Sequence, residues 1–190
     1  MAHLYGKEEH EKESDDILWR EFSKGDLGAL ETIYDRYFYP LMHYGLSLSD
    51  NEELVKDCIQ DLFTSLISRS DIPSVTYVRS YLITTLRYRL FEKQRTEKHI
   101  DSLNEESFEV VVTDDELEAL FASDDDAIEI AQKLRTAYHS LRPNQRHAIY
   151  LRFIKEMSWR EMTEILDISE HSCMNLVLRA INKLRALVKS

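Results

Sequence analysis

The chain has 190 residues, enough for one ordinary domain or two small ones, and its apolar (43%) and charged (31%) fractions are those of a globular protein. Four glycines and three prolines are too few for a turn-rich β sandwich and favour a mostly helical chain. No apolar run approaches the roughly 18 residues of a membrane span, and segment 1–16 lacks the apolar stretch of a signal peptide. We therefore expect a cytoplasmic protein.

The net charge of −11 is unevenly distributed. Residues 101–126 contain eleven acidic residues and no basic one, and the tail 1–16 is also acidic. Residues 127–190, in contrast, contain eleven basic residues against six acidic ones. An acidic linker beside a basic module is compatible with nucleic-acid binding, which the net charge alone would disfavour.

The charge and hydropathy patterns predict an all-α chain of two small helical domains. The expected parts are a charged tail (1–16), a first domain (17–100), an acidic linker (101–126) and a second domain (127–190). The apolar run 108–112 in the linker is compatible with a lone strand or an extended segment, and the high charge around it favours a flexible linker.

Helical spacing of apolar residues marks 17–22, 27–37 and 54–67 in the first domain. Asp50 is the expected N-cap of the third of these helices, and Pro73 its expected end. A fourth helix is expected over about 76–95.

One face of the third helix is polar. Asp57, Gln60 and Asp61 are spaced i, i+3 and i+4, whereas Ile59, Leu62 and Phe63 turn toward the expected core. By itself this pattern is either a partner-binding face or a solvated one.

The fourth helix interleaves basic and aromatic residues. It carries Arg79, Arg87, Arg89, Lys93 and Arg95, together with Tyr77, Tyr81, Tyr88 and Phe91. Basic side chains follow phosphates, and aromatic rings stack on unpaired bases. Because Leu82, Ile83, Leu86 and Leu90 already supply an inward stripe, we expect Tyr81, Tyr88 and Phe91 on the opposite side. The alternative is a core helix with its aromatic rings inward.

In the second domain, the spacing of apolar residues predicts helices over 127–141, 143–154, 159–166 and about 170–188. Ser158 and Glu161 form a capping box at the start of the third. Asp167 suits a left-handed turn, and Ser169 caps the last helix. The inner stripe of that helix is expected to be Cys173, Val177, Ala180, Leu184 and Leu187.

Two helices joined by a three-residue turn, the second one longer, predict a helix-turn-helix. The second helix of such a motif places its N-terminal residues against base edges in the major groove. The candidates here are Glu170, His171, Ser172 and Asn175 for bases, and Arg179, Lys183, Arg185, Arg160 and Lys155 for phosphates. From spacing alone, a helical hairpin with a solvated charged face is the alternative.

Both domains resemble the sigma-70 family of RNA polymerase sigma factors, of the extracytoplasmic-function type. Residues 141–146, 150–153, 157–161 and 165–169, with the closing pairs 179–180 and 184–185, are similar to its region 4. Residues 29–37 and the segment Asp-Cys-Ile-Gln-Asp-Leu-Phe at 57–63 are similar to its region 2.

This resemblance implies partners and site residues. Asp57, Gln60 and Asp61 would bind RNA polymerase core, whose contacts in the family are the β′ clamp helices and the β flap. The helix with Arg79, Tyr81, Arg87, Tyr88, Arg89, Phe91, Lys93 and Arg95 would hold the melted −10 strand. The last helix, with Glu170, His171, Ser172, Asn175 and Arg179, and Arg160 beside it, would read the −35 element of promoter DNA.

The resemblance further implies an anti-sigma factor, often membrane-anchored, and a linker that threads toward the polymerase cleft. The chain departs from the family at Tyr88 and Glu92, where Asn and Asp are frequent. Met174 and Leu176 replace a Lys and a polar residue at the start of the last helix, so we expect weak DNA binding by the isolated second domain.

Two other functions fit the sequence. One is a helix-turn-helix transcription regulator whose first half senses a ligand or dimerises, and the other is a sigma-like adaptor that does not read promoters. An enzyme is not expected, because the chain has no Gly-rich phosphate loop and no nucleophile elbow. We expect no small-molecule substrate, cofactor or metal, and Cys58 and Cys173 are expected to be buried thiols.

Overall fold

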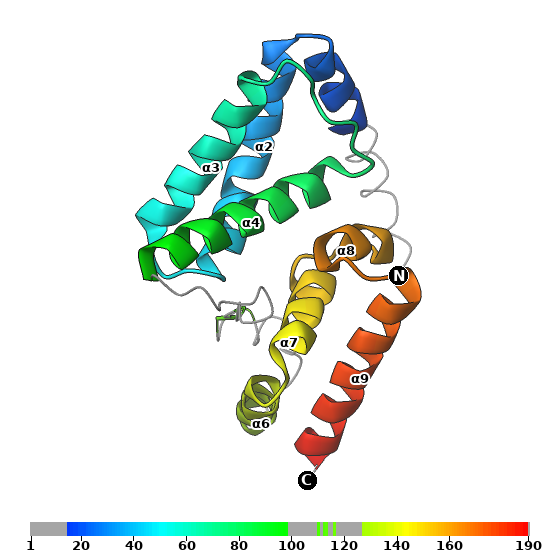
Figure 1. The fold of residues 1–190 in the computed structure, drawn as a ribbon. Coiled ribbons are helices and arrows are strands. Elements are labelled where there is room, and N and C mark those ends of the chain that lie inside the picture. Colours follow the sequence, from blue (N-terminus) through cyan, green and yellow to red (C-terminus); the bar gives the residue numbers. More distant parts are fainter. Residues whose placement is uncertain (1–14, 99–109, 111, 114–115, 117–126, 190) are drawn as a thin grey trace. The chain divides into compact units, whose positions relative to one another are not determined.

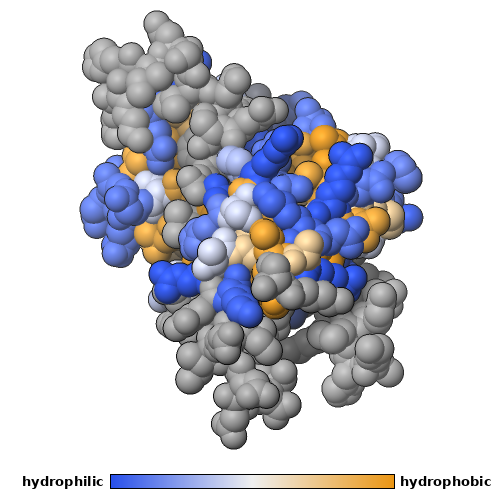
Figure 2. Space-filling model, turned by 90° about the horizontal axis from the view of Figure 1, so that it is seen from below, coloured by the Kyte–Doolittle hydropathy of each residue, from blue (hydrophilic) through white to orange (hydrophobic). Residues whose placement is uncertain are grey.

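The computed structural model describes residues 15–98, 110, 112–113, 116 and 127–189. The regular secondary structure of these residues is helical throughout (Figure 1), as the all-α prediction requires. The chain divides into two compact units, 1–97 and 98–190. Among the described helices, none has the length and apolar character needed to cross a membrane. On the face in Figure 2, apolar residues form separate patches among hydrophilic ones.

The first unit contains a helical segment, 15–23, followed by α2 (Leu27–Leu46), α3 (Glu52–Ile67) and α4 (Val78–Lys98). Helices α2 and α3 lie side by side, and α4 crosses them (Figure 1). Its core is built from apolar side chains of all four helical segments, among them Trp19, Phe22, Ile33, Leu41, Ile59, Leu62, Leu66, Leu82, Leu86 and Leu90.

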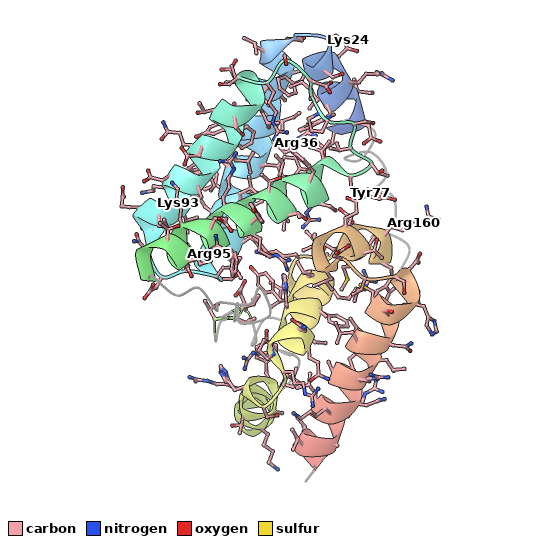
Figure 3. All side chains as sticks on the ribbon, viewed as in Figure 1. Lys24, Arg36, Tyr77, Lys93, Arg95 and Arg160 are labelled. Atoms are coloured by element: carbon pink, nitrogen blue, oxygen red, sulfur yellow. The ribbon has the colours of Figure 1, made fainter. Side chains whose placement is uncertain are left out.

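Segment 15–23 is anchored by Asp15 and Trp19. Asp15, which we expected in the charged tail, is only 7% exposed and accepts hydrogen bonds from Arg36 and from the Tyr37 hydroxyl of α2 (Arg36 is labelled in Figure 3). Burial, together with the hydrogen bond to Asp15, raises the pKa of Tyr37 well above its ordinary value. Trp19 donates its indole N–H to the Pro73 carbonyl at 2.9 Å.

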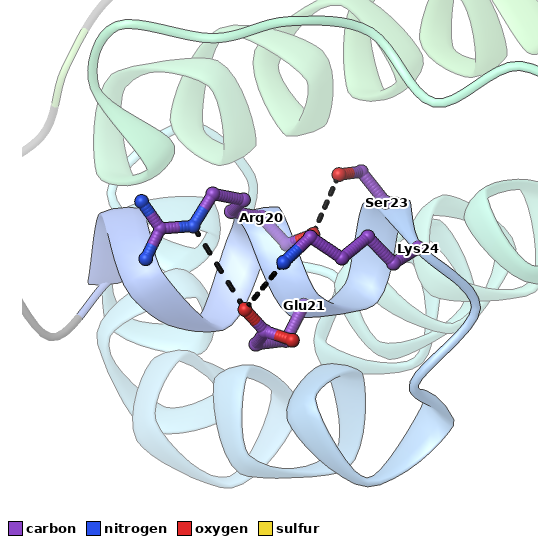
Figure 4. A network of polar contacts seen from close by, with 4 residues as sticks. All are labelled: Arg20, Glu21, Ser23 and Lys24. Atoms are coloured by element: carbon purple, nitrogen blue, oxygen red, sulfur yellow. Dashed lines mark hydrogen bonds and ion pairs between the residues drawn. The ribbon is translucent and has the colours of Figure 1, made fainter.

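The end of this segment is polar and exposed. Glu21 accepts from Lys24 at 2.9 Å and lies 3.8 Å from the Arg20 guanidinium, while Ser23 donates to the Arg20 carbonyl (Figure 4). Such exposed pairs contribute little to stability, about 0–1 kcal/mol each. The buried contacts of Asp15 and Trp19, rather than this network, therefore hold the segment in place.

Side-chain caps start the next two helices. Asp26 accepts from the amides of Gly28 (2.8 Å) and Ala29 (3.3 Å) at the start of α2. The N-cap of α3 is Asn51, which accepts from the Leu54 amide at 3.1 Å, so the assignment of this cap to Asp50 was one residue off. Helix α3 ends at Ile67, before Pro73, because Ser68 already closes its last turn.

The described part of the linker is partly packed. Val110 and Val112 are buried, although we expected a flexible segment, and neither residue is in a strand. Thr113 and Glu116 form a capping box: the Thr113 amide donates to the Glu116 carboxylate at 3.0 Å, and the Glu116 amide to the Thr113 hydroxyl at 3.3 Å. Phe108 and the rest of the expected acidic linker lie outside the described residues.

The second unit contains α6 (Ala127–His139), α7 (Pro143–Ile149), the π-helix η2 (Tyr150–Ile154), α8 (Trp159–Leu166) and α9 (Glu170–Lys189). Helix α9 packs against α6, α7 and α8. Its buried stripe is Cys173, Val177, Ala180 and Leu184, as predicted. Leu187, the fifth expected member, is 40% exposed, since it lies in the last turns of the helix.

Candidate functional site

The polar face of α3 is exposed to solvent in the first unit. Asp57, Gln60 and Asp61 are all exposed, whereas Ile59, Leu62 and Phe63 on the same helix are buried. The helix therefore separates its surfaces as the spacing predicted. Such a face can dock on a partner with basic or hydrogen-bonding side chains.

Two side chains of α4 reach back to α3 beside this face. The ammonium of Lys93 (labelled in Figure 3) lies 2.8 Å from the Asp61 carboxylate, and Arg89 donates to the Ser65 hydroxyl at 2.7 Å. The hydrogen bond to Asp61 raises the pKa of Lys93 above its ordinary value. Asp61, on the polar face of α3, is thus directly joined to the basic helix.

The outward surface of α4 is a stripe of aromatic and basic residues. Tyr81, Tyr88 and Arg95 follow one another at spacings of seven, which places them on one side of α4, and Tyr77 lies just before the start of this helix. Tyr88 is 56% exposed and Arg95 is exposed, while Tyr77 and Tyr81 are half-buried. Tyr81 packs edge-on against Trp19, with 5.3 Å between the two ring centroids.

One expectation for α4 was wrong in detail. Phe91 does not face outward, since it is 7% exposed and belongs to the core. Most basic side chains of α4 are half-buried rather than displayed, namely Arg79, Arg87, Arg89 and Lys93. Phe91 is buried together with Leu82, Ile83, Leu86 and Leu90 of the same helix.

In the second unit, local hydrogen bonds build the expected helix-turn-helix. The Ser158 amide donates to the Glu161 carboxylate at 2.9 Å, and the Glu161 amide donates to the Ser158 hydroxyl at 3.3 Å. Asp167 ends α8 in the left-handed conformation, with φ 51° and ψ 45°. Ser169 then accepts from the Ser172 amide at 3.2 Å in the first turn of α9.

Arg152 fixes the turn that precedes this helix-turn-helix. Arg152 donates to the Met157 carbonyl at 2.6 Å, and its guanidinium lies 4.8 Å from the centre of the Trp159 ring. Between them, Glu156 has a positive φ of 51°. The Arg152 guanidinium therefore links η2, the turn at Glu156 and α8.

The N-terminal turns of α9 are accessible. Glu170, His171, Ser172 and Arg179 are exposed, Asn175 is half-buried, and Arg160 on α8 is exposed (labelled in Figure 3). Met174 and Leu178, one turn apart, are 41% and 54% exposed. Leu176 is half-buried. Leu178 was not singled out from the sequence, although its i+4 spacing from Met174 was a usable signal.

Two lysines expected to contact phosphates have other partners. Lys183 donates to the Ser140 carbonyl just after α6, where the helix dipole favours a cation. Lys155 lies 5.1 Å from the centre of the Tyr150 ring. Arg179 and Arg185 are exposed, as is Lys183.

The cysteines behave as expected, since both are buried free thiols. Burial raises the pKa of Cys173 to about 11 and also raises that of Cys58. Within the part of the chain that the structure describes, no group of His, Cys, Asp and Glu side chains could hold a metal ion.

The two units together define a helical protein with a helix-turn-helix at its C-terminal end. Residues 131–184 match the sequence profile of the family "Sigma-70, region 4". Over 163 residues the chain is 26% identical to the ECF RNA polymerase sigma factor SigM of Bacillus subtilis (strain 168), covering 84% of this chain and 94% of that protein.

A solved structure has a similar fold. The sigma factor RpoE from Bartonella quintana, in a co-crystal structure with the anti-sigma factor NepR, superposes with a TM-score of 0.54 and 21% identity, covering 84% of this chain and 96% of that chain. Together these similarities support the assignment of this chain to the sigma-70 family, as a sigma factor of the extracytoplasmic-function type. Its role is therefore in transcription initiation.

Proposed function

We propose that the protein binds RNA polymerase core and directs it to promoters through three surfaces. Asp57, Gln60 and Asp61 on α3 dock on the β′ clamp helices. The outward stripe of α4 holds the melted −10 strand, and the first turns of α9 bind the −35 duplex. The domains that carry these surfaces are 17–100 and 127–190, and the second also contacts the β flap.

The observation that carries this proposal is that each surface is exposed while the helix bearing it is anchored by its other side. Asp57 and Gln60 face solvent above a buried apolar stripe, and His171 faces solvent above Cys173 and Val177. Tyr88 is exposed on a helix whose Leu86 and Leu90 are fully buried. Anchored helices present side chains to a partner with little loss of conformational entropy on binding.

Different contacts serve the two DNA elements. Tyr88 offers a ring on which an unpaired base stacks, a contact worth about 1–3 kcal/mol. On α9, Asn175 suits an adenine edge, and exposed Arg179 and Arg160 suit phosphates. Met174 and Leu178 suit thymine methyl groups. The scarcity of cations in the first turns of α9 makes −35 binding depend on polymerase holding the domain in place.

An anti-sigma factor is the regulator that we propose. The protein of similar fold from Bartonella quintana was crystallised with the anti-sigma factor NepR. A partner of this class would cover surfaces that the free protein exposes, such as Tyr88 or the Met174–Leu178 pair. Pull-down with the full chain from the source organism would identify the anti-sigma factor and show whether it is membrane-anchored.

Run-off transcription tests the proposal. The purified full chain is mixed with bacterial core polymerase and fragmented genomic DNA, and RNA 5′ ends are sequenced. We expect discrete start sites that require the protein and share −10 and −35 elements. Core binding without start sites would instead support the adaptor, and no core binding would support a plain helix-turn-helix regulator.

Matched variants assign the surfaces. Asp57→Asn with Gln60→Ala should weaken core binding, whereas Glu53→Gln, also exposed on α3, should not. His171→Ala with Asn175→Ala should reduce selectivity at the −35 element. Asn182→Ala, exposed three turns from the start of α9, serves as the control.

A further inference from the structure

We propose that Lys93 is shared between two partners: Asp61 holds it in the free protein, and it passes to promoter DNA when Asp61 engages RNA polymerase. The proposal rests on the proposed function of α3 and α4. It assigns a shared ion pair as the link between polymerase docking and capture of the melted strand.

The pair joins the two helices that bear the proposed surfaces. Asp61 belongs to the polar face of α3, and Lys93 lies on α4, the helix that bears Tyr88 and Arg95. The Lys93 ammonium and the Asp61 carboxylate are 2.8 Å apart. A ligand of either residue must therefore displace or accommodate the other.

The pair is exposed enough to exchange partners. The side chains of Lys93 and Asp61 are 37% and 51% exposed, so water and an incoming group both reach them. Ion pairs at such exposure are weak and screened by salt. A polymerase cation that binds Asp61 releases Lys93 without breaking a buried interaction.

The charge balance gives the coupling its sign. While Asp61 holds Lys93, the carboxylate cancels the attraction of the ammonium for a phosphate and repels that phosphate itself. Once a polymerase cation neutralises Asp61, Lys93 adds one effective positive charge to α4. By thermodynamic linkage, a phosphate that binds Lys93 must equally make Asp61 a better ligand for polymerase.

Asp57 provides a matched control. It lies one turn before Asp61 on the same helix, is exposed and carries the same charge. The ion pair that the structure gives Lys93 is with Asp61. Asp57→Asn and Asp61→Asn therefore change the net charge equally, but only the second frees Lys93.

The first measurement is DNA binding by the full chain without polymerase, using fluorescein-labelled dT12 and fluorescence anisotropy at low salt. Asp61→Asn should tighten binding by about two- to five-fold, the range expected from an exposed ion pair. Its salt dependence should steepen by about 0.7 in log Kd per log unit of salt, one phosphate contact. Asp57→Asn should change the affinity by less than Asp61→Asn, and adding Lys93→Gln should abolish the gain.

The second measurement is core binding without DNA. Lys93→Gln should bind core polymerase about two- to five-fold more tightly than the wild type, because Asp61 no longer has to leave Lys93. The same substitution should have no effect in the Asp61→Asn background. A direct contact between Lys93 and polymerase would give the opposite sign, a loss of affinity.

Several outcomes would overturn the proposal. One is equal tightening of dT12 by the two Asp→Asn variants, which would be an effect of net charge alone. Others are an absence of dT12 binding by Asp61→Asn, or core binding that Lys93→Gln weakens or leaves unchanged. The proposed function fails separately, if Asp57→Asn with Gln60→Ala leaves core binding intact and no start sites appear in run-off transcription.

Discussion

Gly45 of α2 and Val55 of α3 are so close that a Cβ atom on Gly45 would lie 2.3 Å from the Val55 Cγ1 atom. Both residues are buried, and among the glycines that the structure describes, Gly45 makes the closest approach to a side chain. Helix α3 bears the polar face, so this contact sets how close that face lies to α2.

We predict that Gly45→Ala destabilises the first unit by about 1–2 kcal/mol. Overpacking costs about 1–3 kcal/mol, and the better helix propensity of alanine returns up to about 1 kcal/mol. Chemical denaturation would measure the change. In a Val55→Ala background, where the clashing methyl groups are absent, Gly45→Ala should cost less, and an equal cost in both backgrounds would contradict the packing argument.

Replacing Glu156 by glycine should stabilise the second unit by about 0.5–1 kcal/mol. Its φ of 51° is a left-handed conformation that a side chain disfavours. With Trp19 replaced by Phe, the fluorescence of Trp159 would report unfolding of this unit during denaturation. Asp167→Gly, at the same φ, should gain less, because Asp tolerates this conformation. A destabilised Glu156→Gly variant would refute the prediction.

Tyr88 and Phe91 should respond differently to alanine. Tyr88→Ala should leave the fold intact but weaken binding of a melted −10 strand by polymerase holoenzyme about 10- to 100-fold, the value of one stacked base. Tyr88→Phe should retain the affinity. Phe91→Ala should instead cost about 3–5 kcal/mol of folding stability. Circular dichroism and strand-binding titrations together separate the two effects, and normal strand binding by Tyr88→Ala would exclude stacking on this ring.

The thiol of Cys173 should resist alkylation in the folded protein at pH 8, because its pKa of about 11 leaves little thiolate. Stability should also fall as pH rises from about 9 to about 11. In this window the unfolded thiol ionises while the folded one stays neutral, so the unfolded state binds fewer protons. Iodoacetamide labelling followed by mass spectrometry, native and denatured, tests the first point. In the Cys173→Ala variant, the stability of the second unit should fall less steeply over this pH window.

Features that depend on neighbours along the chain were predictable from the sequence. The capping box of Ser158 and Glu161, the left-handed Asp167 and the exposed Asp57–Gln60–Asp61 face each involve residues within four positions of one another. Hydrogen bonds and helical spacing at this range are set by residue type and order. The resemblance to sigma-70 regions 2 and 4 was likewise visible in short motifs.

Features that depend on which helix covers which flank required the tertiary structure. Helical spacing left both sides of α4 available to Phe91, and packing in the first unit decided that this ring is buried. The same holds for Asp15, which was expected in the charged tail but accepts hydrogen bonds from Arg36 and Tyr37 of α2. It also holds for Lys93, whose partner is thirty-two positions away on α3. Amino-acid order determines local hydrogen bonds and helix faces, but burial and long-range ion pairs depend on helix packing, which a periodicity does not encode.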